Sequence, residues 1–209
     1  MRKVMRGEDL SAHLRWDSIP KKNLFAVCPL GRIEGEITIL DGKIFTAKVN
    51  TKGAIAIDTN WNVQSPFAVY AYVAQWQKFT AETAIHTESE LQNVIDKLAA
   101  ENGYDIAKSF PFRIIAEFDS VGFHIISKPK NETKHSHQLH EKAKKHFSFR
   151  KISGELLGFY SQHHEGVFTH KGQFIHTHFI DTKRKNMGHL ENVLLTKKYT
   201  ILLPGIESE

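Results

Sequence analysis

Residues 173–192 read QFIHTHFIDTKRKNMGHLEN, a stretch that combines apolar strand-like runs with closely spaced histidines. Because successive side chains of an extended strand point to opposite faces, His176 and His178 are expected on the same side of one strand. The polar segment 181–186 is typical of a tight connection, and it would return His189 to face the pair across the sheet. Three neutral imidazoles leave a divalent ion such as zinc with an open position, which is the catalytic pattern.

The histidine spacing leaves a second interpretation open. A single histidine in a strand is more often a hydrogen-bonded core or surface residue than a ligand, and short motifs often match falsely. With 13 histidines in 209 residues, some close pairs also arise by chance. The spacing alone therefore favours a metal site and a set of structural histidines about equally.

The run Gly172–Asp181, followed by Gly188 and His189, resembles the metal-binding segment of the α-acetolactate decarboxylases. In that family a His-x-His-Phe-Ile strand and a Gly-Gly-His turn carry the zinc ligands, and Met187 stands here where the first of those glycines usually is. Shorter patches with the same resemblance lie at residues 31–42, 65–69 and 153–159. The ligands that the resemblance implies for Zn²⁺ are His176, His178 and His189.

The resemblance also implies a reaction. Family members remove carbon dioxide from a small 2-hydroxy-3-keto acid, so the expected function is a zinc-dependent carbon–carbon lyase that converts 2-acetolactate to acetoin. Zinc would stabilise the negative charge left when the carboxylate departs, and a positioned acid would then protonate the carbon. Glu36 is the expected catalytic carboxyl, because it stands where the family's Leu-Asp-Gly-Glu stretch carries a glutamate. Glu34 is the neighbour most easily confused with it, and a solvated strand carboxylate is the alternative interpretation.

Two departures from the family pattern bear on the substrate. The family pairs the substrate carboxylate with an arginine, whereas the matching region 123–130 has none. Lys128 or Lys130 would supply the charge, although a lysine lacks the planar fork that binds a carboxylate in two places. His124 is a candidate donor nearby. Family members also carry a carboxylate near the metal in a longer C-terminal tail, and only 20 residues follow His189 here.

These departures support an alternative function. A protein can keep the fold and the histidines, lose the carboxylate clamp, and serve as a metal-binding protein with a binding or regulatory role. Release of carbon dioxide from 2-acetolactate separates this alternative from the decarboxylase.

Composition limits the class of protein and its surroundings. One cysteine, Cys28, excludes an internal disulfide framework, and no apolar run approaches the roughly 20 residues needed to cross a bilayer. We therefore expect a cytoplasmic protein without a membrane partner. Its expected partners are a small-molecule 2-hydroxy-3-keto acid and, in a homodimer, a second copy of the chain.

The formal charge of +5 permits binding to nucleic acid. Lysines are densest in residues 128–146, which also contain the histidine-rich stretch 135–140. No aromatic interleaving and no nucleic-acid motif accompanies them, so a basic, exposed helical face is the favoured interpretation. A nucleic-acid partner is therefore a hypothesis that rests on charge alone.

Strand and turn signals dominate the rest of the chain. Asp41-Gly42 lies between the strand-like runs 36–40 and 43–49 and indicates a hairpin, because both turn positions need positive φ. Two further strands are predicted at 112–118 and 121–127.

Helix signals are fewer. Thr87 and Glu90 form a capping box for a helix over residues 88–102, which Asn102-Gly103 ends. Weaker patterns predict helices over 8–18 and 133–145.

The elements add up to an α+β fold that is rich in sheet. We expect one domain over residues 1–209, with possible sub-units 1–110 and 111–209. The family resemblance implies two packed mixed or antiparallel β-sheet units with few helices.

Overall fold

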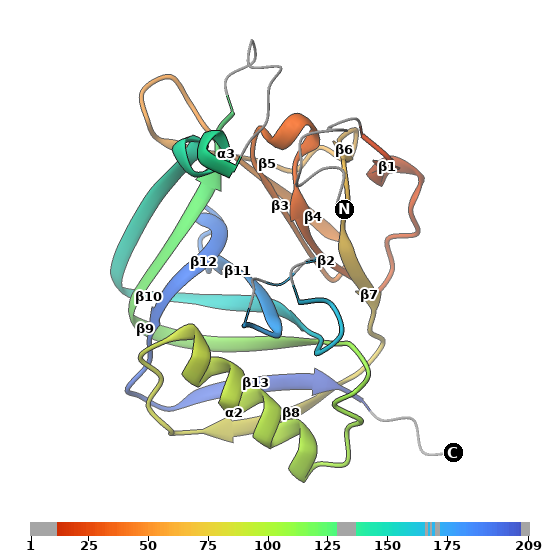
Figure 1. Cartoon of the computed structure of the whole chain (residues 1–209), viewed down its shortest axis with the longest axis vertical. Helices are drawn as coiled ribbons and strands as arrows, with labels where there is room; N and C mark the ends of the chain where they lie inside the picture. Colours follow the sequence, from red (N-terminus) through yellow and green to blue (C-terminus); the bar gives the residue numbers. More distant parts are fainter. Residues whose placement is uncertain (1–11, 129–136, 166, 168, 170–171, 206–209) are drawn as a thin grey trace.

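A computed structural model describes residues 12–128, 137–165, 167, 169 and 172–205. Two antiparallel sheets pack against each other and few helices accompany them (Figure 1), which confirms the predicted sheet-rich α+β fold. The smaller sheet has, in spatial order, β5 (Ile55–Asp58), β4 (Lys43–Val49), β3 (Glu36–Leu40), β2 (Leu24–Pro29) and β7 (Val69–Tyr72). The larger sheet has β10 (Lys144–Tyr160), β11 (Ile175–Asp181), β12 (Met187–Leu194), β9 (Phe110–Ile126), β13 (Tyr199–Pro204) and β8 (Trp76–Ala81).

Short elements complete the described part of the chain. Two short strands form a separate pair, β1 (Leu14–Arg15) and β6 (Gln64–Ser65). The helical elements are η1 (Trp16–Ser18), η2 (Gly31–Ile33), α2 (Glu88–Glu101) and α3 (His137–Ala143). Among the described residues, no helix is long and apolar enough to span a bilayer.

The predicted hairpin joins β3 to β4. Asp41 and Gly42 have φ of 48° and 69°, as a tight turn with two positive φ values requires. A side chain at Gly42 would overlap the carbonyl oxygen of Lys21, so only glycine fits this position. The register that follows pairs Glu36 with Ala47.

This register determines which side chains of β3 face the larger sheet. Ile37 and Ile39 pack with Trp16 in a small cluster on one side of the smaller sheet. Because side chains alternate along a strand, Glu36 and Thr38 project to the other side, toward the larger sheet. The hairpin therefore places a carboxyl and a hydroxyl in the interface between the sheets.

The larger sheet is built around two strands of 17 residues each, β9 and β10, which pair along almost their whole length. The prediction of separate strands at 112–118 and 121–127 was wrong, because β9 continues through both. Pairing omits only Asp119 and Lys151, where Lys151 has φ of 51°. Strands β10, β11, β12 and β9 form a closed ring of pairings, since β10 also pairs with β9.

Helix α2 follows its predicted limits. The Glu90 amide donates to Thr87 Oγ1 at 3.1 Å, and the His86 amide donates to Glu90 Oε2 at 2.6 Å, so the cap satisfies two backbone donors. Leu91 and Ile95 are buried in the core beneath the larger sheet. Gly103, with φ of 79°, follows the C-terminal end.

The two weaker helix predictions were largely wrong. Residues 14–18 form β1 and η1, because the buried Trp16 is anchored through its Nε1, which donates to Ser65 Oγ at 2.8 Å. The predicted helix 133–145 is reduced to α3, since Lys144 and Lys145 pair with β9 as the first residues of β10. Residues 8–11 and 133–136 of these predictions lie outside the described residues.

Candidate metal centre

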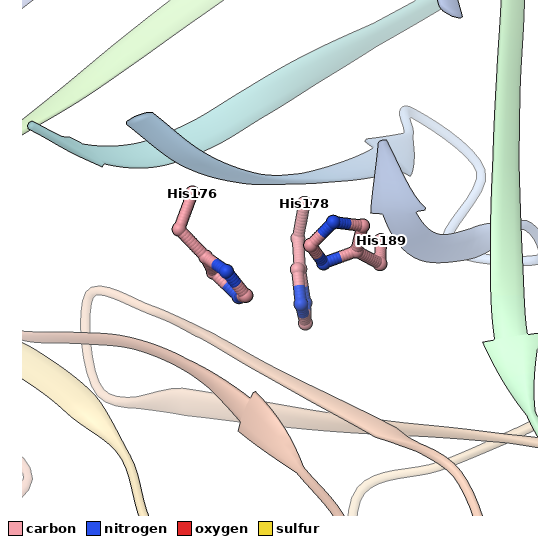
Figure 2. A group of neighbouring side chains, drawn as sticks. All are labelled: His176, His178 and His189. Atoms are coloured by element: carbon pink, nitrogen blue, oxygen red, sulfur yellow. The ribbon is translucent and has the colours of Figure 1, made fainter. Parts of the chain in front are cut away.

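Three histidines converge on the face of β11 and β12 that is turned toward the smaller sheet (Figure 2). His178 pairs directly with His189 across the two strands, and His176 lies two residues before His178 on the same face. One ligand atom from each residue lies within 4.8 Å of the others. His178 is fully buried and His189 is 8% exposed. The structure therefore brings together the three histidines that the sequence singled out.

The connection between β11 and β12 sets this register. Asp181 Oδ1 accepts hydrogen bonds from the amides of Lys185 and Asn186, at 2.7 and 3.1 Å. Gly188 lies so close to β9 that a side chain there would overlap the carbonyl oxygen of His124. These contacts hold β12 against both neighbours, and His189 is thereby fixed opposite His178.

His178 has the protonation state and the free atom that a ligand needs. Its Nδ1 is 3.0 Å from Thr38 Oγ1, within hydrogen-bond distance. Its buried Nε2 has no hydrogen-bond partner, a costly state for a polar atom unless something binds there. Burial lowers the pKa of His178 well below its ordinary value, and neighbouring His176 and His124 lower it further. The neutral ring can donate its lone pair to a metal ion, so the residues fit such an ion.

Glu36 reaches this centre from the smaller sheet. Its Oε2 lies 3.7 Å from His178 Nε2, and its Oε1 accepts a hydrogen bond of 3.3 Å from the Ile126 amide. Burial raises the pKa of Glu36 to about 8, although the Ile126 amide and the Lys144 charge oppose the shift. Without a bound ion, the carboxyl group therefore holds a proton at neutral pH. Glu34, by contrast, pairs with Arg32 at 3.1 Å.

Lys128 lies just beyond β9 and is 8% exposed. Its amide donates to the Ile33 carbonyl at 3.4 Å, next to the chain segment that leads into β3. It stands two residues past Ile126, whose amide contacts Glu36. A direct role for the Lys128 side chain stays a prediction, and Lys130 lies outside the described residues.

A hydrogen-bonded group of His124, Glu191 and His146 lies beside the centre. Of these three residues, the sequence predicted a role for His124 alone. The ring centroid of His124 lies 4.8 Å from that of His189. Glu191 bridges two histidines, with its Oε1 2.9 Å from His124 Nδ1 and its Oε2 2.7 Å from His146 Nδ1. Glu191 lies where the pairing of β12 with β9 shifts register, and such bulges redirect side chains. The hydrogen bonds outweigh the effect of partial burial and hold the pKa of Glu191 at about 2.

Two arginines form a separate ionic group on the larger sheet. Arg113 Nε donates to Glu155 Oε2 at 3.1 Å, and Arg184 donates to Glu155 Oε1 at 2.8 Å. Glu155 is 6% exposed, whereas the side chains of Arg113 and Arg184 are 19% and 37% exposed. Both guanidinium groups bind this internal carboxylate, and Nη1 of Arg184 stays buried without a hydrogen-bond partner among the described residues.

The histidine-rich stretch is only partly described. His135 lies outside the described residues, and His137 and His140 belong to α3. Among the described residues, one group of at least three histidine, cysteine or carboxylate side chains has the geometry to hold a metal ion. It consists of His176, His178 and His189.

Two antiparallel sheets hold three imidazoles and a buried carboxyl in their interface. This fold and site define the class of protein, which is a candidate metal-dependent protein with a catalytic type of site. The family model for α-acetolactate decarboxylase matches residues 7–206, and the chain belongs to that family. This confirms the resemblance found in the sequence and indicates a decarboxylase-type lyase.

Solved structures agree on the fold. The α-acetolactate decarboxylase of Bacillus subtilis strain 168 matches with a TM-score of 0.79 at 18% identity, over 99% of this chain and 83% of that one. The acetolactate decarboxylase of Bacillus subtilis subspecies spizizenii matches with the same score and identity, over 99% and 84%. A Staphylococcus aureus protein of unknown function, similar to the decarboxylase, matches with a TM-score of 0.73 at 16% identity, over 95% and 80%. A comparison with curated protein sequences gives no match.

Proposed function

We propose that this chain is a zinc-dependent carbon–carbon lyase that decarboxylates 2-acetolactate to acetoin. The observation that carries the proposal is the convergence of three imidazoles in a buried interface, where His178 Nε2 has no hydrogen-bond partner. Membership of the α-acetolactate decarboxylase family supports the reaction class. Zinc is the proposed ion because three neutral imidazoles suit it and leave a position open.

His176, His178 and His189 would hold the ion. When bound, it supplies Lewis-acid stabilisation of the negative charge that develops as carbon dioxide leaves. The chain's own part is to keep the rings neutral and correctly oriented. Thr38 engages Nδ1 of His178, which leaves Nε2 turned toward the centre.

Glu36 is proposed as the acid that protonates the carbon after carbon dioxide has left. Its raised pKa keeps a proton on the carboxyl, and the Ile126 amide fixes one of the two oxygens. The other oxygen, Oε2, faces the histidines at 3.7 Å from His178. Because the carboxyl approaches from the smaller sheet alone, it would protonate a substrate from one face and give a single enantiomer of acetoin.

Lys128 is proposed to supply positive charge to the anionic substrate. A buried ammonium next to a low-dielectric site attracts a carboxylate more strongly than an exposed one does. This proposal is supported by the low exposure of Lys128 and by its position two residues past Ile126, whose amide donates to Glu36.

The test is release of carbon dioxide and acetoin from 2-acetolactate by zinc-loaded protein, with zinc measured by elemental analysis. Wild type should bind one zinc per chain and turn over, and His178→Ala should lose both properties. His163→Ala is the matched control, since His163 is exposed and lies outside the three-histidine group.

The alternative is a metal-binding protein of the same fold with a binding or regulatory role. The absence of arginine from residues 123–130 favours it. Zinc bound by wild type at full stoichiometry, without any release of carbon dioxide, would support this alternative and overturn the decarboxylase.

A further inference from the structure

Four histidines line up across the larger sheet, one on each of four neighbouring strands. His178 of β11 pairs with His189 of β12, and His189 pairs in turn with His124 of β9. His124 pairs with His146 of β10. Because paired residues of antiparallel strands project to the same face, these four side chains form one line, the histidine row. The row begins at the fully buried His178 and ends at His146, whose side chain is 60% exposed.

Glu191 links the two outer members of the histidine row. After Leu190, the pairing of β12 with β9 advances by two residues on β12 and by one on β9, which leaves Glu191 without an opposing residue. A bulge of this kind redirects the side chain of the extra residue. The Glu191 carboxylate reaches both outer rings, at 2.9 Å from Nδ1 of His124 and 2.7 Å from Nδ1 of His146.

The hydrogen bond to Glu191 fixes the His124 ring. Burial disfavours the charged form of Glu191, but its hydrogen bonds to His124 and His146 outweigh burial and hold its pKa at about 2. An ionised carboxylate only accepts hydrogen bonds, so Nδ1 of His124 carries the hydrogen and donates it. Hydrogen bonds to a charged acceptor are stronger than neutral ones, and little water competes for this one, because His124 is 3% exposed.

The His124 ring packs against His189, the next member of the row. Their ring centroids lie 4.8 Å apart and the ring planes are inclined by 34°, which is contact between two flat rings. On its other side, the His189 ring lies 4.6 Å from that of His176 and 5.7 Å from that of His178 (Figure 2). His189 therefore stands between a ring that Glu191 holds and the other two candidate ligands.

We propose that His124, held by Glu191, positions His189 as a metal ligand, a role that rests on the proposed zinc centre. A ligand whose orientation is set before the ion arrives loses less conformational freedom on binding, so the ion binds more tightly. Both residues act through His189, so they are positioning residues and not catalytic ones. His146 has no such role, because it contacts the far side of Glu191 at the exposed end of the row.

The affinity for zinc tests this role without any substrate. In competition with a chromophoric chelator, Glu191→Ala should raise the Kd for zinc about ten- to a hundredfold, as loss of a group that supports a metal ligand typically does. Glu191→Gln should bind zinc nearly as tightly as wild type, since its amide oxygen still accepts from Nδ1 of His124. His146→Ala is the matched control. It removes the other, exposed partner of the same carboxylate and should change the Kd little.

A double-mutant cycle tests whether Glu191 acts through His124. His124→Leu removes the flat ring and its hydrogen bond, and it should weaken zinc binding about as much as Glu191→Ala. In the His124→Leu background, Glu191→Ala should have almost no further effect, because the two residues act as one unit. His124→Leu also tests the role on its own if Glu191→Ala does not fold.

The visible spectrum of cobalt-substituted protein gives a second readout, because the absorption bands of Co²⁺ depend on the geometry of its ligands. The spectrum should change in Glu191→Ala and His124→Leu and keep the wild-type form in Glu191→Gln and His146→Ala. Wild-type zinc affinity in Glu191→Ala, an equal loss in His146→Ala, or additive losses in the double variant would overturn the inference. A wild type that binds zinc but releases no carbon dioxide would contradict the proposed reaction alone.

Discussion

Glu36 and His178 come from different sheets, and their facing atoms lie 3.7 Å apart in a buried interface. Both residues are in unusual states for buried polar side chains. The pKa of the Glu36 carboxyl is raised to about 8, and the Nε2 atom of His178 has no hydrogen-bond partner. Perturbed groups that face each other in this way are typical of functional sites.

Replacing Glu36 with Gln tests its role as the acid. The amide keeps the size and a hydrogen-bond acceptor for Ile126 but cannot deliver the proton, so kcat should fall by about 10²- to 10⁴-fold. Zinc content should stay at the wild-type value. Glu34→Gln is the control, since Glu34 pairs with Arg32, and its kcat should stay near wild type. A kcat in Glu36→Gln equal to that of Glu34→Gln would rule out the role.

Glu36 also predicts how the stability of the metal-free protein depends on pH. The folded chain keeps the proton up to a pKa of about 8, whereas an unfolded chain releases it near the ordinary value of 4.5. Folding therefore binds a proton between these values, and the contribution of Glu36 to stability falls as pH rises, by at most about 1.4 kcal/mol per pH unit. Urea unfolding across this range should show the decline in wild type and not in Glu36→Gln. Parallel curves for the two proteins would contradict the assignment.

At the residue scale, the sequence predicts what is local. His176, His178 and His189 belong to one hairpin, so strand periodicity and a short turn suffice to bring them together. Glu191 and His146 were missed because their contacts depend on a register shift and on pairing with a strand far away in sequence. No short-range sequence pattern indicates the register shift or the pairing with the distant strand.

The elements that hold the centre depend on close approach of β12 to β9. Gly188 permits this approach, and Asp181 fixes the preceding turn. Helix α2 supports the same region from the side, since the Phe174 amide donates to Gln92 Oε1 at 2.6 Å just before β11 begins.

Replacing Gly188 with Ala should push β12 away from β9, because the added methyl group would overlap the backbone of His124. We expect a loss of about 1–3 kcal/mol in unfolding free energy and weaker zinc binding, measured by chemical denaturation and zinc titration. Gly205→Ala is the matched control, because its methyl group would make ordinary contacts with Gln75. Equal stability of the two variants would show that the close approach is unimportant.

Replacing Thr87 with Ala tests the cap of α2. The Glu90 amide would lose its acceptor, so the protein should lose about 1 kcal/mol of stability in urea. Ser89→Ala is the control, because Ser89 lies two residues after Thr87 and is exposed, and this change should alter stability little. A Thr87→Ala protein as stable as Ser89→Ala would mean that water replaces the cap at no cost.

At the element scale too, the sequence predicts local structure better than it predicts contacts between segments that are far apart in the chain. The Asp41-Gly42 turn and the Thr87 cap carry strong local chemistry, and both were predicted correctly. The helix expected at 133–145 gave way to strand at Lys144 because pairing with β9 outweighs weak local propensity. Likewise, Trp16 is held by a contact with Ser65, 49 residues away, which no local pattern contains.

On the scale of the whole molecule, the candidate centre lies where the two sheets meet. The larger sheet supplies the histidines, and the smaller sheet supplies Glu36 and Thr38. A bound ion would therefore stabilise the strands of one sheet and, through His178, their contact with the other. Assembly into a homodimer and the division into sub-units at residue 110 stay predictions.

Removal of zinc should lower the thermal stability of the whole domain. A ligand that binds only the folded chain adds about 2.7 kcal/mol when present at a hundredfold its dissociation constant. Calorimetry with zinc and with a chelator should therefore give two different Tm values for wild type. For His178→Ala the two values should nearly coincide, and an undiminished zinc effect in this variant would place the ion elsewhere.

The central claim, that three imidazoles bind one zinc ion, is tested most directly by X-ray absorption spectroscopy of the zinc-loaded protein. We expect three imidazole nitrogens at about 2.0–2.1 Å from the zinc in wild type, and two in His178→Ala if that variant retains zinc. A spectrum without three imidazole ligands in wild type, or an unchanged spectrum at full zinc content in His178→Ala, would contradict it.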